Sequence, residues 1–164
     1  MLIGWTVALG LGVVAVAAQA PAENPCALLT VEEVQSLVPE KEHASNGVSE
    51  AFPAQQSYNC RFRWGAGVDR HTLTVSVNPS AKMYAGMNAD AMKQAFTSSI
   101  KPGTADATVP DIGDAAVFQA DSSVYAAASA LVKGRVLHVQ LDGLDARDKK
   151  GQLITLLKSA ASKL

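Results

Sequence analysis

The chain lacks the residue patterns on which common catalytic and metal sites depend. Its three histidines, His43, His71 and His138, show no metal-ligand spacing, and no His-Glu-x-x-His sequence occurs. A Gly-x-Ser-x-Gly nucleophile elbow, a Walker loop and a Gly-x-Gly-x-x-Gly sequence are absent as well. We therefore expect no catalytic residues, no metal site and no cofactor, and we expect that the protein is not an enzyme.

An excess of charge of one sign is also missing. The 14 Lys+Arg residues nearly balance the 15 Asp+Glu residues, which leaves a formal net charge of -1. Because nucleic-acid affinity rests on a surplus of basic side chains that contact phosphates, this balance argues against a nucleic-acid partner.

The N-terminal segment has no charged side chains, and it is mostly apolar as far as Ala18. It ends in Ala18-Gln19-Ala20, with small residues at the two positions that a signal peptidase reads. We predict a signal peptide over residues 1–20 and one globular domain over residues 21–164, located in the periplasm or outside the cell. After cleavage no stable membrane insertion is expected. Because no Lys or Arg precedes the apolar run, an uncleaved membrane anchor is the alternative.

Cysteine is scarce, and its two occurrences, Cys26 and Cys60, both fall in the predicted mature chain. Export would expose them to an oxidising environment, so a disulfide between them is expected. Closing a loop of about 35 residues would add roughly 3–4 kcal/mol to stability on the chain-entropy model. Redox pairs are usually closer together and zinc sites need more ligands, so the disulfide is predicted to be structural.

The first half of the mature chain predicts a helix followed by a hairpin. Thr30 can cap the amide of Glu33, whose side chain can reach back in a capping box, and Pro39 stops this helix. From Tyr58 the apolar period changes to two, which predicts a strand over residues 58–64 and a second one over 72–77. A short edge strand is expected near residues 48–52.

The second half is expected to add a helix, three strands and a final helix. Residues 81–96 read as a helix that Gly86 and Asn88 interrupt, and residues 97–113 as a long loop. Strands are predicted over 115–119, 125–132 and 135–141. A last helix, capped by Asp145, would bury a stripe of Leu153, Leu156, Leu157, Ala160 and Leu164. This order predicts an α+β fold, a single antiparallel sheet of about five or six strands with helices packed on one face as a two-layer sandwich.

Four short segments together resemble a family of small secreted proteins and lipoproteins of unknown function. They are the Pro-Cys-x-Leu-Leu-Thr start in residues 24–30, the second strand cysteine in 58–62, the Gly-Asp-Ala-Ala step in 112–116 and the Lys-Gly hairpin in 131–134. The resemblance spans most of the mature chain, and it implies an exported α+β domain with a disulfide. The resemblance implies no activity and no catalytic residue. The chain lacks the lipidation cysteine of the lipoprotein members.

A small cationic patch is the first candidate binding surface. Arg61 and Arg63 share one face of their strand, and Arg70 and His71 at the start of the next strand would extend the patch. Such a patch suits an anionic envelope polymer or the acidic surface of a partner protein. The alternative interpretation is a solvated sheet face without a partner.

An apolar pocket is the second candidate. Tyr58, Phe62 and Trp64 point to one side of their strand and suit a core beneath helices. If the helices left part of the sheet uncovered, the same side chains together with Met87 would line a pocket.

Two functional hypotheses follow, and a third remains open. The first is an exported, non-catalytic domain that binds a protein or an envelope component through the cationic patch. The alternative is a carrier that holds a small apolar ligand or a lipid between sheet and helices. An enzyme would require a cleft that gathers residues far apart in the sequence, such as His71, His138 and Asp114.

Overall fold

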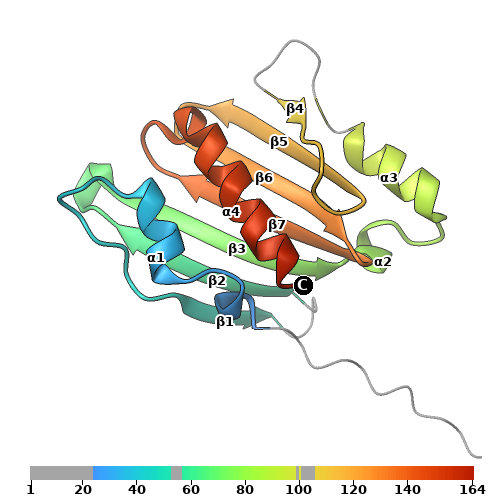
Figure 1. The fold of residues 1–164 in the computed structure, drawn as a ribbon, viewed down its shortest axis with the longest axis horizontal. Coiled ribbons are helices and arrows are strands. Elements are labelled where there is room, and N and C mark those ends of the chain that lie inside the picture. The colour runs from blue at the N-terminus through green and yellow to red at the C-terminus, as the bar shows by residue number, and fades with distance from the viewer. Residues whose placement is uncertain (1–23, 53–56, 99, 101–105) are drawn as a thin grey trace, which may run out of the picture.

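A computed structural model describes residues 24–52, 57–98, 100 and 106–164 and arranges them around one antiparallel sheet (Figure 1). The sheet has seven strands in the order β1-β2-β3-β7-β6-β5-β4. The strands are β1 (Val48–Phe52), β2 (Ser57–Trp64), β3 (His71–Pro79), β4 (Ala107–Thr108), β5 (Ala115–Ser122), β6 (Tyr125–Val132) and β7 (Arg135–Asp142). The predicted signal segment, residues 1–20, and its alternative as a membrane anchor lie outside the described residues.

The helices are short except for the last one. The α-helices are α1 (Val31–Val34), α2 (Ser80–Met83), α3 (Ala89–Thr97) and α4 (Lys150–Ser162). The 3₁₀ turns are η1 (Pro25–Ala27), η2 (Gln35–Leu37), η4 (Gly67–Asp69) and η5 (Ala146–Lys149). Within the described ranges, none of these helices combines the length and the hydropathy needed to cross a bilayer.

Each predicted strand is present, including the short edge strand β1. The sheet is larger than predicted because β4 forms within residues 97–113, which the sequence predicts to be a loop, and pairs with β5. The predicted helix over 81–96 is divided into α2 and α3. Gly86, with a φ of 78°, and the N-cap Asn88 lie at this break.

The sheet consists of two meanders joined in its middle. Strands β1, β2 and β3 form one meander, and β5, β6 and β7 form the other, with β4 added at its edge. The two halves meet where β3 pairs with β7, with Thr74 opposite Gln140. The chain travels from β3 through α2, α3 and β4 before it reaches β5, so this central pairing joins segments far apart in the sequence.

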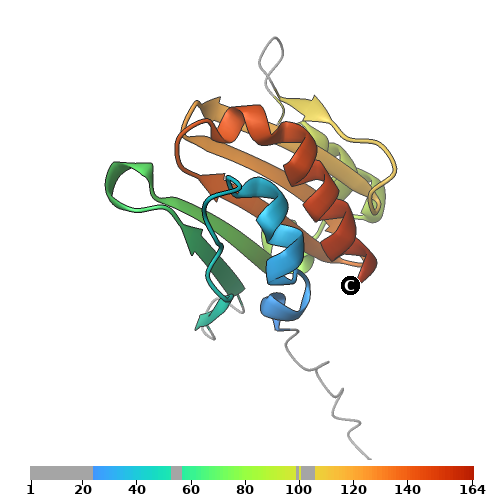
Figure 2. The same ribbon diagram turned by 60° about the vertical axis from the view of Figure 1, so that its left-hand side comes forward.

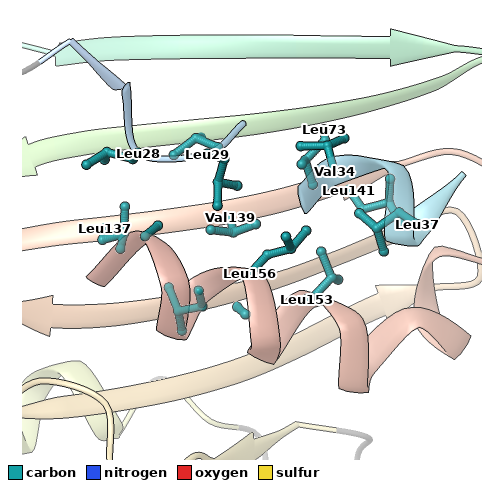
Figure 3. Packing of buried hydrophobic residues seen from close by; sticks show 14 of the residues in the cluster. Leu28, Leu29, Val34, Leu37, Leu73, Leu137, Val139, Leu141, Leu153 and Leu156 are labelled. Carbon is teal, nitrogen blue, oxygen red and sulfur yellow. The ribbon is translucent and has the colours of Figure 1, made fainter. Parts of the chain in front are cut away.

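The main core lies between one face of the sheet and helices α1 and α4. Both helices cross the same face in Figures 1 and 2. Figure 3 shows leucines of the segment that follows η1, of η2 and of α4 converging on those of β3 and β7. Four residues of the predicted stripe of α4, Leu153, Leu156, Leu157 and Ala160, are buried, whereas Leu164 lies beyond the end of the helix and is half-buried. The predicted cap is wrong, because Asp145 precedes η5 with a φ of 57° and its side chain makes no capping hydrogen bond. The capping box of α1 is confirmed, with Thr30 N donating to Glu33 Oε2 over 2.7 Å.

The prediction that helices pack on one face alone is not confirmed. Helix α3 lies behind the sheet in Figure 2, on the face opposite α1 and α4. There Phe96 joins a second buried cluster made of Ala115, Val117, Leu131 and Val136. These residues alternate with residues of the main core, so this end of the sheet is apolar on both faces and needs cover on both.

The predicted disulfide joins Cys26 to Cys60, with the two Cα atoms 5.0 Å apart. It ties η1 to the buried face of β2. A disulfide of this kind persists in oxidising compartments, which fits a location outside the cytoplasm.

Two of the segments that carry the family resemblance have structural roles in turns. Asp114 N donates to Leu131 O over 2.7 Å, and Gly113 has a φ of 56° where an added Cβ would lie 2.3 Å from that same oxygen. Lys133 and Gly134 both have positive φ, as a two-residue type I′ hairpin requires.

Candidate functional site: a polar groove on the open sheet face

An open groove of about 380 Å³ lies on the sheet face opposite α1 and α4, over strands β2, β3 and β7. We call it the polar groove. Its lining consists of polar and charged side chains only, namely Asn59, Arg61, Arg63, Thr72, Thr74, Ser76, Gln140 and Asp142.

The groove arises from the lengths of the side chains on three neighbouring strands. Residues of β3 that alternate with Leu73, Val75 and Val77 point to the open face, and they are the short side chains Thr72, Thr74 and Ser76. Longer side chains of β2 and β7 stand on either side, since Arg61 and Gln140 both lie opposite Thr74. Short residues therefore form the floor and long ones form the walls.

The wall on β2 carries two arginines in different electrostatic states. Arg61 pairs with Glu50 of β1, with Nη1 3.0 Å from Oε1 and 3.0 Å from Oε2. Arg63 is exposed, and among the described residues its guanidinium has neither an ion pair nor a hydrogen bond. Arg63 is therefore the cation of this wall that is available to a ligand.

The wall on β7 is acidic. Gln140 Nε2 donates to Asp142 Oδ2 over 2.9 Å, which orients the carboxylate. Tyr125 of β6 lies directly opposite Asp142. Burial, together with the charges of Asp142 and Asp121, raises the pKa of Tyr125 above its usual value of 10.0. The groove thus has a free cation on one wall and an anion on the other.

A row of polar residues crosses the sheet through one end of the groove. In register it contains Glu50, Asn59, Ser76, His138 and Ser129, one from each of five adjacent strands. Asn59 Oδ1 is shielded from solvent and has no hydrogen-bond partner in the described part of the chain. Leaving a buried acceptor without a hydrogen bond costs about 1–3 kcal/mol. If the Asn59 side chain rotated toward the groove, a hydrogen bond from a ligand to this oxygen would recover that cost.

His138 of β7 and Ser129 of β6 continue this row beyond the groove, where the side chain of Ser129 is buried. Ser129 Oγ lies 2.6 Å from His138 Nδ1, and Ser129 is only 4% exposed. Burial lowers the pKa of His138 below 6.5, so the imidazole is neutral at pH 7. The hydroxyl is too deeply buried to meet a substrate, and the pair serves to satisfy two polar groups inside the sheet.

The structure divides the predicted cationic patch. Arg61 and Arg63 lie in the polar groove, whereas Arg70 is exposed at the end of the β2–β3 hairpin and does not line it. His71 lies on the opposite face, because it alternates with Thr72 and is paired with the buried Trp64. Its ring stacks on that of Trp64 with the centroids 5.3 Å apart. Its two nitrogens lie 2.8 Å and 3.0 Å from backbone carbonyl oxygens.

The structure does not bring the candidates for an apolar pocket together. Phe62 and Trp64 are 1% and 4% exposed and belong to the main core, while Tyr58 is half-buried at the start of the same strand. Met87 is 46% exposed and belongs to the segment between α2 and α3. Aromatic residues of β2 therefore fill the core beneath the helices.

The residues suggested for an enzyme are also separated. His71 and His138 point to opposite faces of the sheet, and Asp114 lines a different hollow, of about 520 Å³, beside α3. In the described ranges there is no group of three or more potential metal ligands among His, Cys, Asp and Glu.

Sequence reasoning missed six of the eight groove residues. Alternation along β3 already places Thr72, Thr74 and Ser76 opposite the core, and alternation along β2 does the same for Asn59. Gln140 and Asp142 join them only through the pairing of β3 with β7, for which the sequence contains no local signal.

Comparisons with known proteins identify no relative of this chain. No protein-family model, no curated protein and no solved structure matches the chain. The fold defines the class, an antiparallel α+β domain with one disulfide, and the family resemblance of the sequence stays a prediction.

Proposed function

We propose that this chain is an exported, non-catalytic binding domain that contacts a protein or an envelope component through the polar groove. The observation that carries the proposal is the exposed guanidinium of Arg63, without a partner among the described residues, at the edge of a hydroxyl-lined floor. Arg61 on the same wall differs, because Glu50 neutralises its charge.

Two features support export. The N-terminal segment 1–20 has the composition of a signal peptide, and the Cys26–Cys60 disulfide is of a type that persists in oxidising compartments. On this proposal the domain works in the periplasm or outside the cell.

The alternative hypothesis, an apolar carrier, has no comparable support. The side chains that would line its pocket are packed in the core or lie apart, as Phe62 and Met87 do. No apolar side chain lines the polar groove, so an apolar ligand would gain little free energy by burial there.

Nuclear magnetic resonance on the isotope-labelled, disulfide-bonded protein tests the proposal. Addition of a soluble envelope extract from the host should shift or broaden signals of β2, β3 and β7, and Thr74→Arg, which fills the groove, should abolish the effect. Thr155→Arg is the matched control, because Thr155 is exposed on α4 on the far side of the sheet. Changes that map to α1 and α4, or that survive Thr74→Arg, would refute the proposal.

A further inference from the structure

We infer that the polar groove binds an acidic oligosaccharide, with a sugar carboxylate at Arg63 and sugar hydroxyl groups along the floor and at Asp142. This inference rests on the proposed function and names the chemical class of its ligand. It follows from the composition, the charge arrangement and the shape of the groove.

The polar lining of the groove favours a ligand that has polar groups on all sides. Its eight lining residues offer two hydroxyl-bearing threonines, one serine, two amides and three charged groups. A lipid or a peptide with apolar side chains would leave its apolar surface without a partner here, whereas sugar hydroxyl groups both donate and accept hydrogen bonds.

The charges of the groove favour a ligand with one carboxylate. Glu50 neutralises Arg61 from the outer side, so of the two arginines that line the groove Arg63 is the one with a free guanidinium, whose planar fork suits a carboxylate. Asp142 lies two strands away, about 10 Å at the usual strand spacing. A compact, multiply charged anion would be repelled by Asp142, but a hydroxyl group donates to it.

The shape of the groove suits a short linear molecule. The floor runs along β3 from Thr72 to Ser76, about 13 Å at the rise of a strand residue. A ligand along this line meets Arg63 and Asp142 at one end, since both lie opposite Thr72. At the other end it reaches Asn59, which lies opposite Ser76. The amide oxygen of Asn59 has no partner in the described part of the chain and is shielded from solvent, so it would accept from the ligand after rotation of the side chain.

Isothermal titration calorimetry with defined sugars tests the inference on the disulfide-bonded protein. The probes are trisaccharides with a single uronic acid, galacturonosyl-galactobiose and glucuronosyl-cellobiose, and the neutral controls are galactotriose and cellotriose. We expect at least one acidic trisaccharide to bind with a Kd on the order of 0.1–1 mM, and its neutral counterpart to bind about tenfold more weakly or not at all.

Three variants separate groove recognition from general charge attraction. Arg63→Gln should weaken binding of the acidic sugar about tenfold or more, as expected for the loss of a charge-assisted pair. Arg70→Gln is the matched control, because Arg70 is an exposed arginine outside the groove, and it should leave the Kd unchanged. Thr74→Val keeps the shape of the floor, removes one hydroxyl, and should weaken binding several-fold.

Other outcomes overturn the inference and not the proposed function. Sodium sulfate that binds as tightly as the sugars would show recognition of any anion, and a triglutamate peptide that binds while both acidic sugars fail would show a peptide ligand. Failure of all these probes also overturns the inference, whereas envelope extract that still shifts the groove signals would leave the proposed function standing.

Discussion

Glu33 joins the first and the last helix of the domain, and replacing it with glutamine should destabilise the fold measurably. Its carboxylate accepts from Thr30 N over 2.7 Å in the capping box and from Lys163 Nζ over 2.8 and 2.9 Å. Ser159 Oγ of α4 donates to the same group, and Lys163 Nζ also donates to Leu28 O over 3.0 Å. One side chain thus caps α1 and holds the C-terminal end of α4 against it.

The pKa of Glu33 sets the size of the expected effect. Partial burial raises this pKa, but the hydrogen bonds from Lys163, Ser159 and Thr30, with the charge of Lys163, outweigh burial and lower it from 4.5 to about 2. Without screening, this difference in pKa between the unfolded and the folded state would contribute roughly 3 kcal/mol to the free energy of unfolding. Because the side chains of Lys163 and Glu33 are 35% and 30% exposed, solvent screening reduces the stabilisation to about 1–2 kcal/mol.

Urea unfolding followed by the fluorescence of the buried Trp64 measures this contribution. Because the pKa of Glu33 is lower in the folded state, its stabilisation is present above pH 4.5 and is lost as the pH falls toward 2. Glu33→Gln should therefore lose about 1–2 kcal/mol at pH 7 and much less than that near pH 2. Glu40→Gln, an exposed acid nearby, should change stability by less than about 0.5 kcal/mol. An equal loss for Glu33→Gln at both pH values would refute the reasoning.

Three further perturbations test other contacts of the fold. The double variant Cys26→Ala/Cys60→Ala should lose about 3–4 kcal/mol in urea unfolding, and an unchanged midpoint would show that the disulfide contributes nothing. Gly47→Ala should lose about 1–3 kcal/mol, because the new Cβ would lie 2.6 Å from Cys60 Sγ, and a neutral effect would mean that this contact relaxes without cost. Burial lowers the pKa of His138, so the unfolded state binds its proton first and stability should fall as the pH drops below 6.5. His138→Gln should flatten that part of the stability curve; a curve identical to that of the parent protein would contradict the assignment.

Local patterns predicted the elements of this fold well. The alternation around Cys60 and Leu73 predicted β2 and β3, and the capping box at Thr30 predicted where α1 begins. These signals depend on neighbours within a few residues, so they can be read from the chain alone.

Contacts between distant segments could not be read in the same way. The pairing of β3 with β7, the position of α3 on the second face and the bonds from Lys163 to Glu33 all depend on the tertiary arrangement. In the candidate site, Arg61 and Arg63 were predicted from alternation. Adjacency in the sequence suggests that His71 joins Arg70, but alternation from Leu73 places His71 on the core face.

The central claim, that the polar groove is the contact surface of an exported domain, is tested most directly by site-specific photo-crosslinking in the living host. A crosslinking amino acid at position 74 lies on the floor of the groove, and one at Lys158 lies on the exposed side of α4. The account predicts a discrete crosslinked product from position 74, none from position 158, and loss of the product when Arg63→Gln is added. Products of equal yield from both positions, or a product from position 74 that is indifferent to Arg63→Gln, would contradict it.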